Sequence, residues 1–127
     1  MIFDEIFKNK SFFLIAGPCV VESEKITYEI AEALKKITDD LDIPFIFKAS
    51  YKKANRTSIN SFSSIGEEKA LKILFSVRKQ FNVPVITDVH NEEEALLAAQ
   101  YVDCLQIPAF LCRQTELLVA AGKTGLP

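Results

Sequence analysis

The sequence lacks several signatures that assign a protein class at once. Its three cysteines form no CxxC pair, and this odd, scattered set argues against a disulfide framework. It has neither a Gly-x-Gly-x-x-Gly nor a P-loop motif, which weakens a nucleotide-binding interpretation. Its apolar runs fall short of the roughly 20 residues that cross a bilayer. Its acidic start is unlike a signal peptide. We therefore expect a cytoplasmic protein.

The overall charge is slightly acidic. A net charge of −2 and a pI near 5.4 argue against nucleic acid or a membrane as the main partner. With 49% hydrophobic residues, the 127-residue chain can bury one core.

One segment departs from this balance. Residues 47–58 contain no carboxylate and carry the cations Lys48, Lys52, Lys53 and Arg56. Lysine offers a mobile point charge and arginine a planar fork that matches two oxygens of a phosphate. The segment therefore predicts a site for phosphate or carboxylate groups, with a solvated basic loop as the alternative.

Short apolar runs alternate with helix-like segments along the chain. The predicted strands are residues 12–16, 44–47, 84–87 and 102–107. The predicted helices are 24–41, capped by Ser23, 66–81, one capped by Asn91, and 113–121, which should stop at Gly122. In the third helix, glutamates 92–94 suit the helix N-terminus. The pattern predicts an α/β fold, either part of a (β/α)8 barrel or a small doubly wound sheet.

The polar residues at the strand ends favour the barrel. Strand alternation places Lys48 beside Ile46, Asp88 beside Ile86 and Gln106 beside Cys104 on one face. The opposite face should pack under the helices through Phe45, Phe47, Val85, Leu105 and Ile107. Barrel enzymes keep their active sites at the carboxyl ends of the strands. Because a (β/α)8 barrel takes about 250 residues, we expect residues 1–127 to be the N-terminal half of a single barrel domain, its first four βα units.

Five motifs in order resemble one enzyme family, 3-deoxy-D-manno-octulosonate 8-phosphate (KDO-8-phosphate) synthase. They are Leu-Ile-Ala-Gly-Pro-Cys-Val-Val-Glu-Ser (14–23), Phe-Lys-Ala-Ser (47–50), Lys-Ala-Asn-Arg-Thr-Ser (53–58), Ile-Thr-Asp-Val-His (86–90) and Gln-Ile-Pro-Ala-Phe-Leu-Cys-Arg-Gln-Thr (106–115). The resemblance implies a homotetrameric (β/α)8 transferase of lipopolysaccharide biosynthesis. It would condense phosphoenolpyruvate with arabinose 5-phosphate and water, giving KDO 8-phosphate and inorganic phosphate.

A sister family, 3-deoxy-D-arabino-heptulosonate 7-phosphate synthase, is the first alternative. It shares the opening motif and uses erythrose 4-phosphate, but usually carries Lys-Pro-Arg-Thr-Ser where this chain has Lys-Ala-Asn-Arg-Thr-Ser. It also lacks the Pro-Ala-Phe-Leu stretch after Gln106, so the five-carbon acceptor is favoured. Further alternatives are a catalytically incomplete phosphate-binding fragment and an aldolase forming a Schiff base through Lys48. We expect the isolated chain to be inactive.

The resemblance implies roles for individual residues. Cys19 matches the thiolate ligand of the metal-dependent branch, which binds Zn²⁺, Fe²⁺ or Mn²⁺ with further ligands that would lie outside this chain. The alternative for Cys19 is a packed small residue. The substrate-binding positions are Lys48, Ser50 and Lys53 for phosphoenolpyruvate, Asn55, Arg56 and Thr57 for arabinose 5-phosphate, and Asp88, Gln106, Pro108, Ala109 and Arg113.

Three of these positions, Lys48, Asn55 and Asp88, are also expected to be catalytic. In the family, the arginine at position 56 reaches the substrate phosphate of a neighbouring subunit. Asp88 has a structural alternative as a helix-capping or turn carboxylate. Lys52 lies outside the matched pattern and is expected to be solvated. The role of His90, either hydrogen bonding in the site or packing at the strand end, stays open.

Overall fold

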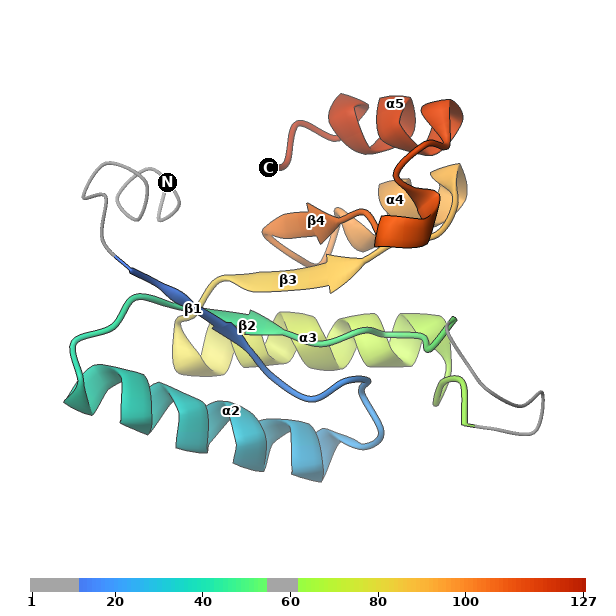
Figure 1. Ribbon diagram of the computed structural model, residues 1–127. Helices are drawn as coiled ribbons and strands as arrows, with labels where there is room; N and C mark the ends of the chain where they lie inside the picture. The colour runs from blue at the N-terminus through green and yellow to red at the C-terminus, as the bar shows by residue number, and fades with distance from the viewer. Residues whose placement is uncertain (1–11, 55–61) are drawn as a thin grey trace.

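The computed structural model describes residues 12–54 and 62–127, which form one parallel sheet with helices between its strands (Figure 1). The strands are β1 (Leu14–Ala16), β2 (Phe45–Lys48), β3 (Val85–Asp88) and β4 (Cys104–Gln106). Each strand pairs with the next in the order β1-β2-β3-β4. A doubly wound sheet reverses its strand order at a switch point, so that alternative is wrong. The sequential order is the arrangement of a partial (β/α)8 barrel, as predicted.

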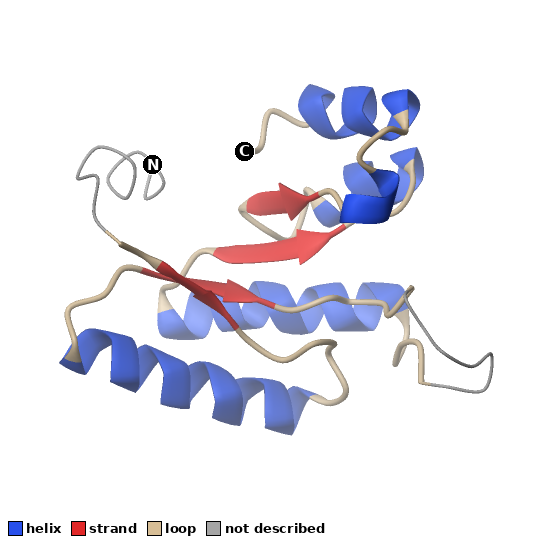
Figure 2. Ribbon diagram, in the orientation of Figure 1, coloured by secondary structure: helices blue, strands red, loops and turns tan. Residues whose placement is uncertain are grey.

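The helices follow the strands in strict alternation. They are α2 (Glu24–Asp40), α3 (Glu67–Phe81), α4 (Glu92–Ala98) and α5 (Thr115–Lys123), with a short 3-10 helix η1 (Ala109–Leu111) after β4. Figure 2 shows α2 and α3 on the same side of the sheet, with the strand arrowheads all directed toward one end. None of the helices in the described ranges is long and apolar enough to cross a membrane.

Helix caps confirm two predicted starts and correct one predicted end. The Ser23 hydroxyl accepts a 3.3 Å hydrogen bond from the Ile26 N–H, and Asn91 Oδ1 accepts one of 2.9 Å from the Glu94 N–H. The prediction that the last helix stops at Gly122 was wrong, because α5, which begins at Thr115, includes Gly122 and ends at Lys123. The glycine that takes a positive φ is Gly125, at 75°. A glycine within a helix costs only about 1 kcal/mol relative to alanine, so it does not by itself end one.

The two faces of the sheet bury different clusters, as the alternation predicted. On the helix side, Phe47 and Val85 belong to the main core with Leu71 and other helix residues. On the other face, Ile46 and Ile86 form a small cluster against which Phe13 and Cys104 pack. Burial raises the pKa of the Cys104 thiol, as expected of a cysteine that packs against apolar side chains. Lys48 and Asp88 lie on this second face, at the ends of β2 and β3.

The close approach of β1 to β2 requires a glycine at position 17. A Cβ atom there would lie 1.9 Å from the carbonyl oxygen of Lys48. Beyond this point the two chains stay together, because the Ser50 N–H donates to the Cys19 carbonyl (3.2 Å) and the Val21 N–H donates to the Ser50 carbonyl (2.9 Å). The main chain therefore holds Cys19 against the loop that follows β2.

Candidate functional site

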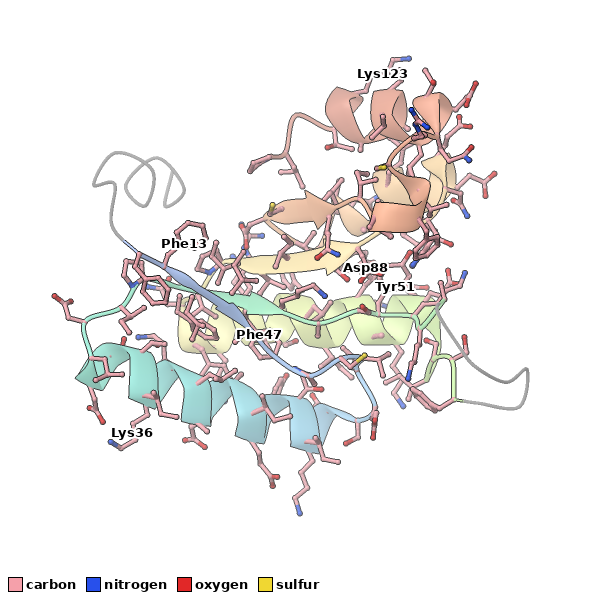
Figure 3. The ribbon with its side chains drawn as sticks, viewed as in Figure 1. Phe13, Lys36, Phe47, Tyr51, Asp88 and Lys123 are labelled. Atoms are coloured by element: carbon pink, nitrogen blue, oxygen red, sulfur yellow. The ribbon has the colours of Figure 1, made fainter. Side chains whose placement is uncertain are left out.

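A cavity of about 350 Å³ opens at the carboxyl ends of the strands. It is lined by Cys19, Ser50, Lys52, Lys53, Ala54, Asp88, His90 and Phe110. Asp88 is the last residue of β3, and the others come from the segments that follow β1 to β4, so the sheet brings distant motifs to one rim. Figure 3 shows Asp88 and Tyr51 at this end of the sheet and Phe13 at the other.

The structure gathers several of the predicted site residues at this rim. Cys19, Ser50, Lys53 and Asp88 line the cavity. Lys48 and Gln106 lie on the same face of the sheet, where Gln106 pairs with Asp88 in the register of β3 and β4. Asn55, Arg56 and Thr57 lie outside the described residues. Whether these side chains bind substrate stays a prediction.

The predicted positions after β4 are not brought into this cavity. Pro108 is buried, Ala109 is exposed at the start of η1, and Arg113 is exposed between η1 and α5. Among the described residues, the one from this segment that lines the cavity is Phe110. Cys112 lies at the end of η1.

Two side chains at the rim hold the carboxylate of Asp88. The Ser50 hydroxyl donates to Oδ1, and His90 Nε2 lies 3.2 Å from Oδ2. Burial acts to raise the pKa of Asp88, but the hydrogen bonds from His90 and Ser50, its own backbone N–H and the charge of Lys48 together lower it. Asp88 is therefore ionised at neutral pH. The helix-capping alternative for Asp88 was wrong, because Asn91 caps α4.

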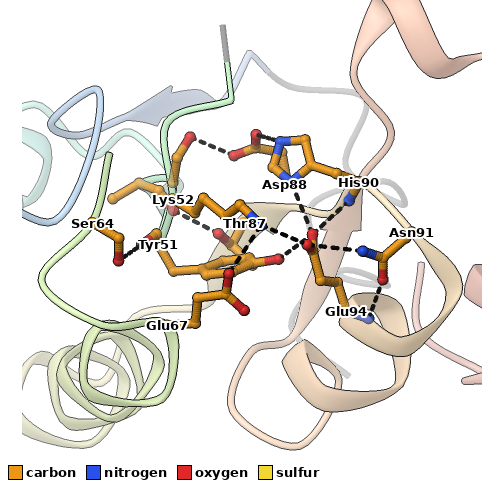
Figure 4. Close-up of polar contacts among 11 residues, drawn as sticks. Tyr51, Lys52, Ser64, Glu67, Thr87, Asp88, His90, Asn91 and Glu94 are labelled. Carbon is orange, nitrogen blue, oxygen red and sulfur yellow. Dashed lines mark hydrogen bonds and ion pairs between the residues drawn. The ribbon is translucent and has the colours of Figure 1, made fainter. Parts of the chain in front are cut away.

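Glu94 is a central residue of the site that the sequence analysis missed. It is only 6% exposed, and its Oε2 lies 2.6 Å from the Tyr51 hydroxyl and 2.9 Å from both the backbone N and Nδ1 of His90. Its Oε1 accepts 3.0 Å hydrogen bonds from Lys52 Nζ and Asn91 Nδ2 (Figure 4). Burial acts to raise the pKa of Glu94, but these bonds outweigh burial and lower it to about 2.

The environment of Glu94 confirms one expectation and corrects another. Glu94 lies in the first turn of α4, as predicted, and its carboxylate is in addition buried among hydrogen-bond donors. Lys52 is not simply solvated, because its Nζ lies 2.9 Å from Glu67 Oε1 as well as 3.0 Å from Glu94 Oε1. Hydrogen bonds to these two carboxylates raise the pKa of Lys52. The one sequence signal that singled out Glu94 among the three glutamates was the spacing Asn-x-x-Glu from Asn91, which resembles a capping box.

The role of His90, left open by the sequence, is hydrogen bonding within the site. Its ring lies between Asp88 and Glu94, and its side chain is 11% exposed. The hydrogen bond to Asp88 raises the pKa of His90 most, burial opposes this, and Glu94 raises the pKa further. Tyr51 packs edge-on against the ring, with 6.4 Å between the ring centroids.

Cys19 is the candidate metal ligand of the described residues. Its thiol is exposed and lines the cavity, where an ion can reach it. Within residues 12–54 and 62–127, however, no group of three or more His, Cys, Asp and Glu side chains is arranged to hold a metal ion. A site at Cys19 would therefore draw further ligands from elsewhere.

Comparison with known proteins agrees with the motifs that meet at this rim. Residues 5–127 match the DAHP synthetase I family. Proteins named 2-dehydro-3-deoxyphosphooctonate aldolase are 56% identical in Methylibium petroleiphilum, over 94% of this chain and 42% of that protein, and 59% identical in Koribacter versatilis, over 89% and 41%. The corresponding protein of Rickettsia prowazekii is 54% identical over 95% and 44%. This name is a synonym of KDO-8-phosphate synthase.

The chain spans about 42% of the length of the Methylibium petroleiphilum relative that it matches. Three observations agree with one another. The strands are parallel and in sequential order, the polar rim lies at their carboxyl ends, and the family match covers nearly the whole chain. The chain therefore belongs to the DAHP synthetase I family.

Proposed function

We propose that this chain carries part of the active site of a KDO-8-phosphate synthase. The reaction condenses phosphoenolpyruvate with arabinose 5-phosphate and water, and releases inorganic phosphate. The observation that supports it best is the cavity in which Cys19, Ser50, Lys53, Asp88 and His90 meet, since these residues come from motifs of the family. The names of the similar proteins support the same activity.

The chemistry of the rim suits the proposed substrates. Both substrates are phosphorylated, and the cations of the segment after β2 supply the charge complementarity that such anions need. In a cavity with little water, each cation interacts with a phosphate more strongly than at an open surface. Lys48 and Lys53 would hold phosphoenolpyruvate with the Ser50 hydroxyl, while Asn55, Arg56 and Thr57 would hold the sugar phosphate.

Asp88 would orient the sugar or a water molecule in this site. It is suited to this role because it is ionised and fixed by Ser50 and His90. Lys48 would stay close to the reacting groups, since its charge already acts on Asp88. Gln106 would add a hydrogen bond to substrate from the neighbouring strand. Pro108, Ala109 and Arg113 do not line this cavity, and they would contribute only at the edge of the substrate site, from the segment after β4.

A divalent metal is part of the proposal. Cys19 would supply one thiolate ligand to Zn²⁺, Fe²⁺ or Mn²⁺, ions that accept a thiolate beside imidazole and carboxylate ligands. Such an ion would polarise or position the groups that react. We further propose a homotetrameric protein of the cytoplasm, in which Arg56 reaches the substrate phosphate of a neighbouring subunit.

A chimera tests the activity. Residues 1–127 replace the matching segment of the Methylibium petroleiphilum protein, and phosphate release is measured with phosphoenolpyruvate, a divalent metal and either sugar phosphate. We expect turnover with arabinose 5-phosphate and loss of turnover in a folded Lys48→Ala chimera. Preference for erythrose 4-phosphate would favour the sister activity, and a folded chimera that binds both substrates without turnover would favour the incomplete binding module.

Two further measurements separate the remaining alternatives. The 127-residue chain alone should release no phosphate, and turnover by it would contradict our expectation that it is catalytically incomplete. Borohydride should trap no covalent adduct on Lys48 in the presence of substrate, because the proposed reaction needs no imine. A trapped adduct would favour the aldolase alternative.

A further inference from the structure

The two carboxylate oxygens of Glu94 hold two different groups at the cavity wall. Oε2 accepts hydrogen bonds from the Tyr51 hydroxyl and the His90 backbone N–H, and it lies 2.9 Å from the His90 ring Nδ1. Oε1 accepts hydrogen bonds from Lys52 Nζ and Asn91 Nδ2 (Figure 4). His90 and Lys52 both line the cavity, whereas Glu94 stands behind them. Glu94 therefore acts on the cavity through its neighbours.

The ring of His90 is fixed from both sides. Nδ1 lies 2.9 Å from Glu94 Oε2, and Nε2 lies 3.2 Å from Asp88 Oδ2. Ionised carboxylates only accept hydrogen bonds, so both ring nitrogens can donate only when the ring is an imidazolium. A neutral ring would turn one nitrogen lone pair toward a carboxylate oxygen. The geometry thus favours the protonated ring and one orientation of it.

Lys52 is fixed in a similar way. Its Nζ bridges Glu67 on α3 and Glu94 on α4, which places the ammonium between two helices and at the cavity wall.

The charged and titratable groups around the pair formed by His90 and Glu94 are Asp88 on β3, Lys48 on β2, Tyr51 and Lys52 after β2, and Glu67 on α3.

We infer that Glu94 is a positioning residue, whose carboxylate fixes the His90 ring with Nε2 toward Asp88 and fixes the Lys52 ammonium beside it. A hydrogen-bonded partner behind a functional side chain sets the orientation and protonation of that side chain, and its loss changes both. The effect on the ring stands by itself, and only its consequence for turnover rests on the proposed function.

The ring can be observed directly because His90 is the only histidine of the chain. In the 127-residue chain, its imidazole carbon-bound protons give one set of NMR signals whose shift against pH yields the pKa. We expect Glu94→Gln to lower the pKa of His90 by about 1 unit, equivalent to about 1.4 kcal/mol. The control, Glu93→Gln, removes the same charge from an exposed position in the same helical turn and should change that pKa several-fold less.

The outcome that overturns the inference is an equal shift in both variants, or no shift in a folded Glu94→Gln chain. If Glu94→Gln does not fold, Glu94→Asp takes its place, because it keeps the charge and withdraws the carboxylate by one methylene. It should lower the pKa by a smaller amount than Gln would. A folded Glu94→Asp chain with an unchanged His90 pKa would also overturn the inference.

Activity in the chimera supplies the consequence for turnover. Glu94→Gln should lower kcat and move the basic limb of its pH profile to lower pH, since a less basic His90 loses its proton earlier. Glu93→Gln should leave both unchanged. Because the NMR measurement needs no substrate, an inactive chimera would count against the proposed function, and an unshifted ring would count against the role of Glu94.

Discussion

The hydroxyl of Tyr51 donates a 2.6 Å hydrogen bond to Oε2 of Glu94, a residue 43 positions further along the chain. The bond is buried and joins the segment after β2 to the first turn of α4. Burial and this bond both raise the pKa of Tyr51, so the phenol stays protonated and can only act as the donor here. The segments on either side of the cavity are held together at this point.

Replacing this hydroxyl should cost stability without changing the fold. We expect Tyr51→Phe to lower the free energy of unfolding by about 1.5–3 kcal/mol, the range for a hydrogen bond to a charged group. Urea denaturation of the two chains measures the difference. The control is Tyr28→Phe, since the Tyr28 ring packs edge-on against Phe81 and its hydroxyl bonds to no described residue. An equal loss in both variants would contradict the prediction.

Replacing two glycines by alanine should change the stability of the chain in opposite directions. Gly17→Ala would place a methyl group 1.9 Å from the Lys48 carbonyl oxygen, a backbone atom that cannot move aside cheaply. We expect a loss of about 3 kcal/mol or more, at or beyond the upper range for overpacking. Gly122→Ala meets nothing within 4 Å in α5 and should gain about 0.5–1 kcal/mol. Thermal unfolding of both variants tests the pair, and a similar Tm for the two would refute it.

Stability should be greatest between about pH 4.5 and 6.5, because Glu94 and His90 shift in opposite directions. The pKa of Glu94 falls from 4.5 to about 2 on folding, so its contribution is complete above 4.5 and is lost as the pH falls toward 2. The pKa of His90 rises above 6.5, so its contribution is complete below 6.5 and is lost as the pH rises through the folded value.

The acid side of this profile should depend on Glu94. A lowering from 4.5 to about 2 corresponds to stability on the order of 3 kcal/mol. Urea titrations from pH 6 to pH 2.5 should therefore show a flatter acid limb for Glu94→Gln than for the parent chain. An acid limb of unchanged slope in the folded variant would show that other carboxylates carry the effect.

The proposed metal site predicts that replacing Cys19 and replacing Cys112, which are both exposed, have different effects on activity. In the active chimera, Cys19→Ala should lower phosphate release about 100-fold or more, because loss of a ligand costs at least as much as loss of its outer partners. A chelator should inactivate the parent chimera and have little further effect on this variant. Cys112→Ala, at the end of η1, should behave like the parent. Full activity of Cys19→Ala in the presence of chelator would rule the proposal out.

The alternation of apolar and polar residues was enough to predict which side chains share a face of the sheet. Alternation in β2 and β3 placed Ile46 and Ile86 on one face and Phe47 and Val85 on the other, and the structure confirms it. Helix ends were harder, since Gly122 offered a stop signal that α5 passes through. Such a signal is a weak preference that the neighbouring residues can override.

The interior of the site could not be read from the sequence in the same way. Residues 92–94 are three consecutive glutamates, and nothing local shows which of them turns inward. Glu94 is buried because Tyr51 and Lys52 arrive from the far side of the cavity. Motif resemblance identified Cys19, Ser50 and Asp88, which do lie at one rim, but it passed over Lys52 and Glu94 because they lie outside the motifs.

The contact at Gly17 has a practical consequence for altering the chemistry of the cavity. The backbone fixes the position of the Cys19 α-carbon, because the Cys19 carbonyl accepts a hydrogen bond from the Ser50 N–H and Gly17, two residues earlier, lies close against the Lys48 carbonyl. A different side chain at position 19 would therefore start from the same backbone position. A thiolate, an amide or a carboxylate could be exchanged there without moving the main chain.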